Sequence, residues 1–275
     1  MNEPTHSPIG GGARVFATQR YRLSTLTVRE HLLVVVLKGV KGLHALHKVL
    51  TARQGQGIMI ARGTQWDVVN DPEGLTQYEA IALSFPDRLI HALSQHPLPA
   101  QRCTVKHANV LAIDDDLLEA LIRTVPRKPG MRLSNEILQH RVVEVLLHLR
   151  ERGYQFDETQ KVTWNEQIRR LVAQRPDVDW SASKLAAKFH VSESTLRRRM
   201  SSADLSLVGL VRDVRLETAL GLLQTTNLLV GEVAHQCGWA SHSRFSAAFA
   251  ERWGVSPSVV RGRKTGLAQE LTESG

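Results

Sequence analysis

The feature that most constrains the fold of this chain is an arrangement of small and apolar residues that occurs twice near its C-terminal end. In residues 181–202 a small residue, a turn residue and two apolar residues follow one another as Ala186, Val191, Leu196 and Met200. Residues 230–254 hold the corresponding Ala234, Trp239, Phe245 and Phe249. The offset between the copies is 48 residues before the turn and 49 after it, so the second turn is one residue longer. Because residues four apart share one face of a helix, the arrangement predicts two helix-turn-helix units.

The second helix of each unit has an exposed face opposite its apolar stripe. At about 100° per residue, the positions opposite Leu196 and Met200 are polar, and those opposite Phe245 and Phe249 are short or polar. A helix of this kind fits the major groove of DNA. Arg199 lies nearer the buried side, where it can pack or support a phosphate contact. We predict base contacts from Ser194, Arg197, Arg198, His242, Ser243, Arg244, Ser246 and Ala247.

Residues 206–224, between the two units, are rich in apolar residues and favour one buried helix. A helix of this length spans about 28 Å at about 1.5 Å per residue. Successive major grooves on one face of B-DNA lie about 34 Å apart. A rigid connector of this size would therefore hold two reading helices about one DNA turn apart.

The charge of the chain agrees with an anionic partner. The formal net charge is +8, with an isoelectric point near 9.9. Residues 162–264 carry 15 Lys and Arg against 9 Asp and Glu, a net charge of +6, and residues 1–161 carry 20 against 16, a net charge of +4. The positive charge per residue is thus highest in the helical part, where nucleic-acid binding would require it.

The two cysteines, Cys103 and Cys237, lie far apart and suggest no disulfide framework, which indicates a reducing compartment. The N-terminus lacks the basic start and apolar core of a signal peptide. The longest apolar run, residues 32–37, is far shorter than the roughly 20 residues needed to span a bilayer. We therefore expect a cytoplasmic protein with no membrane partner.

The first half of the chain has a different character. Residues 1–14 are polar and glycine-rich, typical of a lead-in, and residues 20–85 contain short apolar stretches separated by glycines, which favours a small antiparallel sandwich or barrel. Helices are predicted over 114–125 and over 133–152, the second ending at Gly153. Polar residues 154–163 are the expected linker, followed by a self-contained helical part without strands.

Residues 165–263 resemble the DNA-binding domain of AraC/XylS-type regulators. The matching stretches are WSASKLAAKFHVSESTLRRRM, VRLETALGLLQ and GEVAHQCGWASHSRFSAAFAERWGVSPSVVRGR. Less specifically, HLLVVVLKG and LTARQGQGIMIARGTQWDVVN resemble the cupin-like arm of that family. The resemblance implies an α+β chain with a cupin-like regulatory and dimerisation domain over 1–153, followed by an all-α domain with two helix-turn-helix units over 164–264.

The function implied by this resemblance is sequence-specific regulation of transcription, with an activator as the expected type and with control through the N-terminal domain. The implied partners are double-stranded DNA, RNA polymerase, a small-molecule effector or regulatory protein, and a second copy of the chain. No cofactor is implied. In the family both recognition helices contact bases, but Ala247 stands where members often carry a long polar or basic residue. The second unit is therefore expected to read DNA more weakly and to bind mainly through phosphates.

Alternatives remain for the N-terminal half. A metal-dependent cupin enzyme would use histidines such as His44 and His47, but the region lacks the His-x-His, Glu and later His that such enzymes carry. Trp66 and Asp67 could line an effector pocket. Alternatively, Trp66 is a core residue and Asp67 is a turn residue. The helix over 133–152 has apolar residues on more than one stripe, so it can serve its own core alone or a dimer as well. A third alternative is a domain that only docks a partner protein. No phosphate-binding loop and no catalytic motif is recognisable, so we expect neither a metal nor an enzyme.

Overall fold

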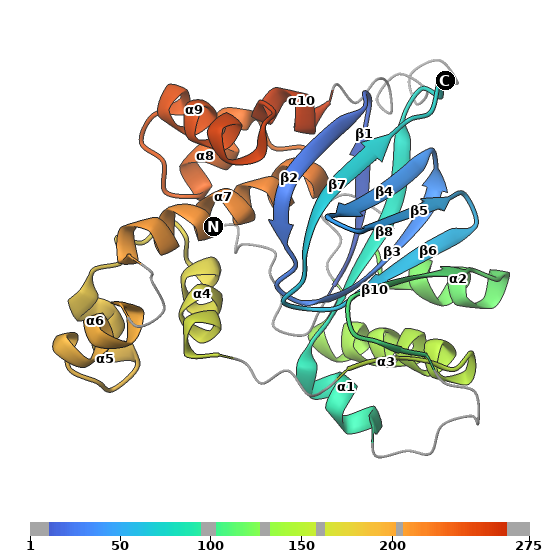
Figure 1. Cartoon of the computed structure of the whole chain (residues 1–275), viewed down its shortest axis with the longest axis horizontal. Coiled ribbons are helices and arrows are strands. Elements are labelled where there is room, and N and C mark those ends of the chain that lie inside the picture. The colour runs from blue at the N-terminus through green and yellow to red at the C-terminus, as the bar shows by residue number, and fades with distance from the viewer. Residues whose placement is uncertain (1–10, 95–102, 127–132, 158–162, 202–205, 263–275) are drawn as a thin grey trace.

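Two β-sheets pack face to face in the computed structural model (Figure 1). The structure describes residues 11–94, 103–126, 133–157, 163–201 and 206–262. One sheet has the order β1 (Gly12–Ala17), β8 (Tyr78–Phe85), β3 (His31–Lys38), β6 (Gln56–Ile60) and β10 (Ala108–Ala112). The other has the order β2 (Tyr21–Thr27), β7 (Gln65–Asp71), β4 (Val40–Ala45) and β5 (Lys48–Arg53). Neighbouring strands in both sheets are antiparallel, which confirms the predicted sandwich.

The apolar run in β3 is explained by burial on both faces of its sheet. Val34 and Val36 point into the sandwich, while Leu33 and Val35 point to the other side. There they meet the helices that cover the five-stranded sheet: α1 (Asp87–Ser94), α2 (Asp115–Arg123) and α3 (Asn135–Glu151). Side chains alternate between the two faces of a strand, so a strand covered on both faces is apolar throughout.

Several predicted boundaries agree with the structure and two do not. Asp114 and Ser134 cap α2 and α3, and Gly153 follows α3 with a φ of 79°. The predicted lead-in is too long, because β1 already begins at Gly12 and pairs with β8. The predicted linker starts too early, because β11 (Tyr154–Phe156) pairs in parallel with β9 (Cys103–Val105). A three-residue strand with a distant partner leaves no periodic signal in the sequence.

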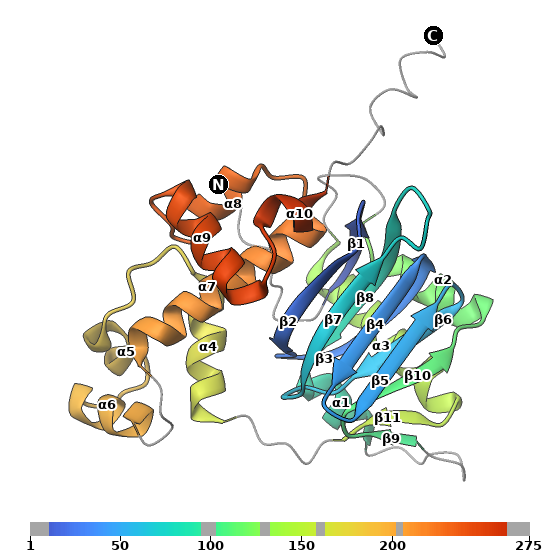
Figure 2. The same ribbon diagram turned by 45° about the horizontal axis from the view of Figure 1, so that its top comes forward.

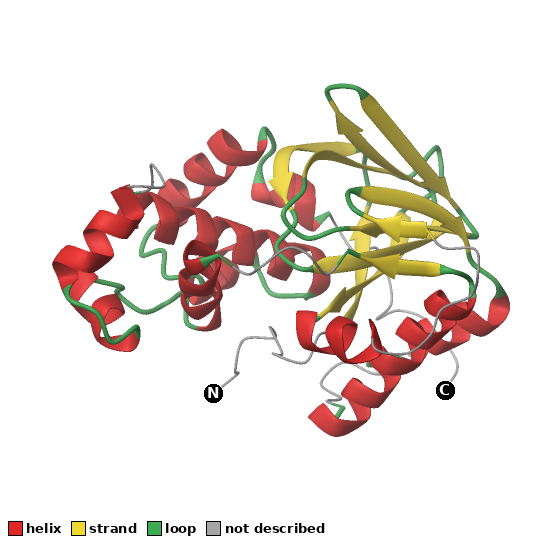
Figure 3. Cartoon of the chain, turned by 60° about the horizontal axis from the view of Figure 1, so that its bottom comes forward, coloured by secondary structure: helices red, strands yellow, loops and turns green. Residues whose placement is uncertain are grey.

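From residue 163 onward the described residues contain helices and no strand (Figure 3). The helices are α4 (Trp164–Gln174), α5 (Ala182–Lys188), α6 (Glu193–Ser201), α7 (Leu207–Thr225), α8 (Val230–Gln236), α9 (His242–Trp253) and α10 (Pro257–Arg261). The pair α5 and α6 projects away from the sheets, whereas α9 lies beside β2 and α10 beside β1, and α8 packs against α7, α9 and α10 (Figure 2). Among the described helices, none combines the length and apolar content needed to cross a bilayer.

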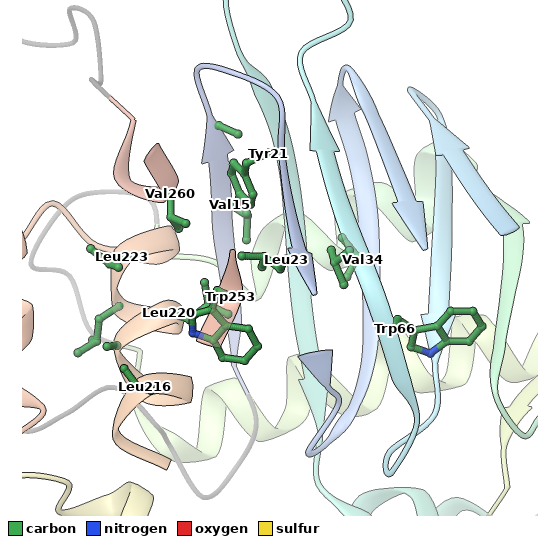
Figure 4. Close-up of a cluster of buried hydrophobic side chains, with 14 of the residues drawn as sticks. Val15, Tyr21, Leu23, Val34, Trp66, Leu216, Leu220, Leu223, Trp253 and Val260 are labelled. Carbon is green, nitrogen blue, oxygen red and sulfur yellow. The ribbon is translucent and has the colours of Figure 1, made fainter. Parts of the chain in front are cut away.

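The helical part is less self-contained than expected. Leu216, Leu220 and Leu223 of α7 belong to one buried cluster with Trp253 and Val260 and with residues of β1 and β2 (Figure 4). The α4–α6 region has a separate core around Ile168, Leu185, Leu196 and Met200. Helix α7 has buried residues all round, and a helix of this kind must be covered on several sides without its sequence revealing by what.

Candidate nucleic-acid interface

The two helix-turn-helix units have matching turns. The backbone N–H of Val191 donates to the Ala186 carbonyl over 3.0 Å, and that of Trp239 donates to the Ala234 carbonyl over 2.9 Å. The residue before each donor is left-handed: His190 has a φ of 53° and Gly238 a φ of 76°. These hydrogen bonds confirm that Ala186 and Ala234 are equivalent, and that Val191 and Trp239 are equivalent.

The recognition helices begin in the same way. Ser192 Oγ accepts from the Thr195 N–H at 3.2 Å, and Ser241 Oγ accepts from the Arg244 N–H at 3.4 Å. Such caps satisfy N–H groups that have no partner within a helix. In each helix the capping hydroxyl also bonds a serine two residues on, Ser194 at 2.9 Å and Ser243 at 3.0 Å. The extra residue of the second turn falls between the small residue and this cap.

Helix α6 exposes the face that the sequence predicted. Leu196 and Met200 are 0% and 4% exposed, while Ser194, Arg197 and Arg198 are exposed. Arg197 lies 3.8 Å from Glu193 one turn earlier, a surface pair that does not bury its guanidinium. The Arg199 guanidinium lies over the Trp164 ring, 5.3 Å from its centroid. Arg199 therefore packs against α4, which is one of the two roles expected from the sequence. Arg197 and Arg198 are therefore the cations on the face opposite Leu196 and Met200, while Arg199, which is also exposed, lies toward α4.

Helix α9 exposes His242, Ser243, Arg244 and Ala247, while Ser246 is half-buried. Its other face is aromatic: ring centroids are 5.8 Å apart for Trp239 and Phe245, 5.6 Å for Phe245 and Phe249, and 6.4 Å for Phe249 and Trp253. These edge-to-face and tilted contacts run along the buried face of α9, and Trp239 joins that face to the preceding turn.

Further contacts fix the frame around both units. Arg215 of α7 donates to the Pro176 and Val178 carbonyls at 2.8 and 3.2 Å, which anchors the loop between α4 and α5. Arg212 of α7 pairs with Glu251 of α9. The connector α7 thus contacts both units, and its 19 residues match the predicted length.

Arg252, although it lies on α9, faces the sheets instead of solvent. Its guanidinium donates to the Ser24 and Thr25 carbonyls at 3.4 and 3.1 Å and stacks 4.1 Å from the Trp253 ring centroid. This residue ties the second unit to β2. Sequence reasoning did not anticipate this role, because the partners are backbone atoms more than 200 residues away.

Ion pairs join α4 and α7 to the β-rich part. Arg29 donates to Glu217 through two nitrogens, at 2.7 and 3.1 Å, and lies 3.7 Å from Glu166. Arg170 of α4 donates to Asp87 at the start of α1 over 3.0 Å. Burial raises the pKa of Glu166 despite the neighbouring arginines. The helices that adjoin the first unit, α4 and α7, are therefore joined to the first half of the chain by ion pairs. The second unit is joined to it through the shared apolar core.

The residues considered for an N-terminal site have structural roles. Trp66 is 4% exposed in the sandwich core, and its Nε1 donates to Thr64 Oγ1 at 3.0 Å. Asp67 lies in β7 and not in a turn, where it accepts from the Thr25 N–H and from Arg22, both at 2.6 Å. These donors lower its pKa. The described residues contain no group of three or more His, Cys, Asp or Glu that could hold a metal, His44 included.

A buried polar row that sequence reasoning missed crosses the four-stranded sheet. Tyr21, Asn70 and Lys41 face one another on β2, β7 and β4. The Lys41 Nζ donates to Asn70 Oδ1 at 2.9 Å, and Asn70 Nδ2 donates to the Tyr21 hydroxyl at 2.7 Å. Gln224 of α7 donates to the same hydroxyl at 2.9 Å, so the row reaches the connector helix. Burial lowers the pKa of Lys41 to about 8.

Comparison with known proteins gives two family matches. A model described as a helix-turn-helix domain matches residues 185–263, and a model described as the ExsA N-terminal regulatory domain matches residues 31–156. The urease operon transcriptional activator of Escherichia coli is 32% identical over 97 residues, which cover 35% of this chain and 33% of that protein. The virulence regulon transcriptional activator VirF of Shigella flexneri is 27% identical over 96 residues, covering 35% and 37%. These matches span about a third of the relatives' own length.

Among solved structures, unsaturated fatty acid bound ToxT from Vibrio cholerae strain SCE256 superposes with a TM-score of 0.59. The identity is 15%, and the match covers 94% of this chain and 96% of that one, so the likeness concerns the fold. It confirms the α+β architecture with a β-rich first part and a helical second part. The matched proteins are transcription regulators and not enzymes, which decides against the metal-dependent cupin enzyme.

Proposed function

This chain belongs to the AraC/XylS-type family of transcription regulators, and on that premise we propose that it binds specific DNA through α6 and α9 and regulates transcription from there. The observation that carries the proposal is the pair of equivalent, capped recognition helices, each with one buried apolar stripe and one exposed face. Together they would read two successive segments of the major groove.

The proposed base contacts are Ser194, Arg197, Arg198, His242, Ser243, Arg244, Ser246 and Ala247. Arginine suits guanine edges, where it can donate two hydrogen bonds at once. Ser246 is half-buried and Ala247 has no polar atom, so the second helix would contribute less to specificity. Mapping the binding sites of the protein across the genome of its host tests the proposal. Reproducible peaks that share one motif support it, and scattered binding that follows DNA abundance refutes it.

The proposed division of labour places the regulatory part in residues 1–153, continued through β11, and the DNA-binding part in residues 164–264. RNA polymerase would be the protein partner, and the cytoplasm the site of action. Exposed Ile137 and Leu147 of α3, 48% and 44% exposed, offer a surface for a second copy. Sedimentation of wild type and Leu147→Glu tests dimerisation, since only the wild type should form the larger species.

A small-molecule effector is a further part of the proposal. Lys41 is 7% exposed, and the hydrogen-bond partner described for its ammonium group is the neutral Asn70. A buried ammonium group without a carboxylate partner is unfavourable, and an anionic ligand would relieve it. The buried Tyr78 hydroxyl lacks a hydrogen-bond partner among the described residues. A carboxylic acid with an apolar tail fits this environment, the chemical class of the unsaturated fatty acid bound by ToxT.

Thermal unfolding with and without an unsaturated fatty acid tests this site. A ligand that binds only the folded protein raises its melting temperature. The rise should be present in wild type and absent in Lys41→Met, which keeps the length of the side chain but removes its charge. A rise of equal size in both proteins would refute the role of Lys41.

A further inference from the structure

The second recognition helix, α9, rests against a bulge in the edge strand β2. The pairing of β2 with β7 shifts its register around Ser24 and Thr25. The carbonyls of these two residues accept from the Arg252 guanidinium of α9, at 3.4 Å for Ser24 and 3.1 Å for Thr25. A Cβ built on Gly254, which follows α9, would lie 3.9 Å from the Ser24 hydroxyl. The β2 bulge therefore contacts the C-terminal end of α9 through backbone and side-chain atoms.

The β2 bulge is held in its shape by the sandwich. Thr25 has a φ of 51°, in the left-handed region that a β-branched residue rarely adopts. Its N–H donates to Asp67 Oδ1 of β7 at 2.6 Å, and Arg22 donates to the other oxygen of that carboxylate at 2.6 Å. An unfavourable backbone conformation persists only where its surroundings fix it, and bulges often serve to aim a functional group. Asp67 is thus the residue through which the four-stranded sheet fixes the bulge that Arg252 contacts.

Arg252 lies on the side of α9 that faces away from the proposed base contacts. At about 100° per residue, its direction differs from that of Ser243 by about 180°. The sandwich therefore holds α9 from behind and leaves His242, Ser243 and Arg244 exposed. A contact in this place can set the position of a recognition helix without touching DNA.

The two recognition helices differ in how they are supported. The buried cluster that contains Phe249 and Trp253 of α9 also contains Leu23 of β2 and other residues of the sandwich (Figure 4). The buried members of the cluster beneath α6 all lie within residues 168–214 of the described chain. Helices α5 and α6 project away from the strands (Figure 2). A displacement of β2 would therefore reach α9 directly, whereas α6 keeps a core of its own.

We propose that Arg252 is a positioning residue for DNA reading, through which the β2 bulge sets the position of α9 and not that of α6. The proposal rests on the proposed function, because it concerns how one of the two recognition helices meets its bases. A recognition group must be held within about 0.5 Å of its productive position, which requires support from the residues behind it. Arg252 and the bulge supply that support for α9.

Operators with one block of bases scrambled measure the two helices separately. Wild type, Arg252→Ala and Asp67→Ala are titrated as full chains with an operator selected from random DNA, and with copies scrambled under α6 or under α9. Asp67→Asn is the conservative variant, because its side-chain oxygen can still accept from the Thr25 N–H. Arg170→Ala is the matched control, since it removes an arginine that joins the helical part to Asp87 of α1 instead.

We expect Arg252→Ala and Asp67→Ala to bind the intact operator about tenfold more weakly than wild type, a loss of about 1.4 kcal/mol. Scrambling under α9 should then cost these variants less affinity than it costs wild type, while scrambling under α6 should cost every protein the same. Asp67→Asn and Arg170→Ala should match wild type. A loss of stability alone would lower the affinity for all three DNAs equally, so the ratios separate positioning from folding.

Hydrogen exchange of the DNA-free proteins gives an independent measurement. Amides of residues 242–253 should exchange faster in Arg252→Ala and Asp67→Ala than in wild type, and those of residues 193–201 should not. The proposal is overturned if both blocks lose their effect equally, if Asp67→Ala leaves the α9 block as in wild type, or if exchange rises equally in both helices. Failure of the wild type to bind any operator would instead count against the proposed function, and the exchange rates would still decide whether the bulge holds α9.

Discussion

At the scale of single residues, three adjacent arginines show that position on a helix decides what a side chain does. All three are exposed on α6, but Arg199 lies over the Trp164 ring, while Arg197 and Arg198 lie on the face opposite the buried stripe. As a bare triplet they would be read as a solvated charge run. Their helical phase relative to Leu196 and Met200 assigns the roles, and that phase could be taken from the sequence because it depends only on local spacing.

Arg198→Ala is expected to lower specific DNA affinity by about 1–3 kcal/mol, the usual loss when a guanine contact is removed. The residue lies opposite the buried stripe of α6 and is exposed. Titration of a labelled operator with both proteins measures the change. Lys38→Ala, which removes an exposed charge from the β-rich part, is the control. An Arg198→Ala protein that binds as tightly as wild type would show that the face is wrongly assigned.

His31 should make stability depend on pH. Its side chain is 3% exposed, and burial lowers its pKa to about 4, the attraction of Asp87 being outweighed. Below its unfolded pKa of about 6.5, the unfolded chain binds a proton that the folded chain does not, so this contribution is present above pH ~6.5 and is lost toward pH ~4. The slope contributed is at most about 1.4 kcal/mol per pH unit.

The matched variant is His31→Asn, whose side-chain oxygen can accept from the Arg62 N–H as the His31 Nδ1 does at 3.3 Å. The variant loses the ring contact with Phe156, so it should be less stable at neutral pH. Its stability should nevertheless fall less steeply than that of wild type between pH 6.5 and 4. Denaturant unfolding at several pH values measures both slopes, and parallel curves would contradict the assignment.

At the scale of elements, the two helix-turn-helix units were predictable from the sequence, and the parallel pair of strands β9 and β11 was not. Caps, turn contacts and stripes lie within a few residues of one another, so Ser181, Ser192 and Ser241 mark helix starts in the sequence. The pairing of β9 with β11 joins segments about 50 residues apart through backbone groups, with one side-chain hydrogen bond from Gln155 to Thr104 at 2.9 Å. A backbone contact of this kind does not restrict which side chains occur, so no pattern announces it.

The two recognition helices should differ in how strictly they read bases. Helix α6 presents two exposed arginines, while α9 presents Arg244 and His242 beside short side chains. A mismatched base pair typically costs about 1–3 kcal/mol where a good contact exists. Base substitutions under α6 should therefore reduce affinity more than those under α9. A systematic operator scan measures this, and greater sensitivity under α9 would reverse the ranking of the two helices.

At the scale of the whole molecule, the structure joins what the sequence suggested were separate parts. The apolar residues of α7, α9 and α10 belong to one buried cluster with the interior of the β-sandwich, which includes residues of β1 and β2. Apolar periodicity shows that such surfaces must be buried but not against what. The polar row from Lys41 to Gln224 is equally long-range, because Gln224 donates to the hydroxyl of Tyr21, 203 residues earlier in the chain. The link between regulatory and DNA-binding parts could therefore be found only from the structure.

Arg29 should be a measurable part of this link. Its side chain is 30% exposed and its partner Glu217 is 15% exposed. Arg29→Ala removes both hydrogen bonds that Arg29 donates to Glu217 and leaves Arg169, at 3.6 Å, as the remaining ion-pair partner of this half-buried carboxylate, so the variant is expected to destabilise the protein by about 1–3 kcal/mol. Arg53→Ala breaks the exposed pair with Glu73 and should change stability by less than about 1 kcal/mol. Chemical unfolding of both variants decides, and equal effects would mean that the Arg29 contact adds no more than a surface pair.

The central claim is that one chain reads two successive segments of the major groove with α6 and α9. Selection of binding sites from random DNA by the purified full-length protein tests it most directly. The account predicts an enriched motif with two blocks of specified bases whose centres lie about 10 base pairs apart, one turn of B-DNA. Arg198→Ala should lose the information in one block and keep the other. No enriched motif, or a single block that Arg198→Ala leaves intact, would contradict the account.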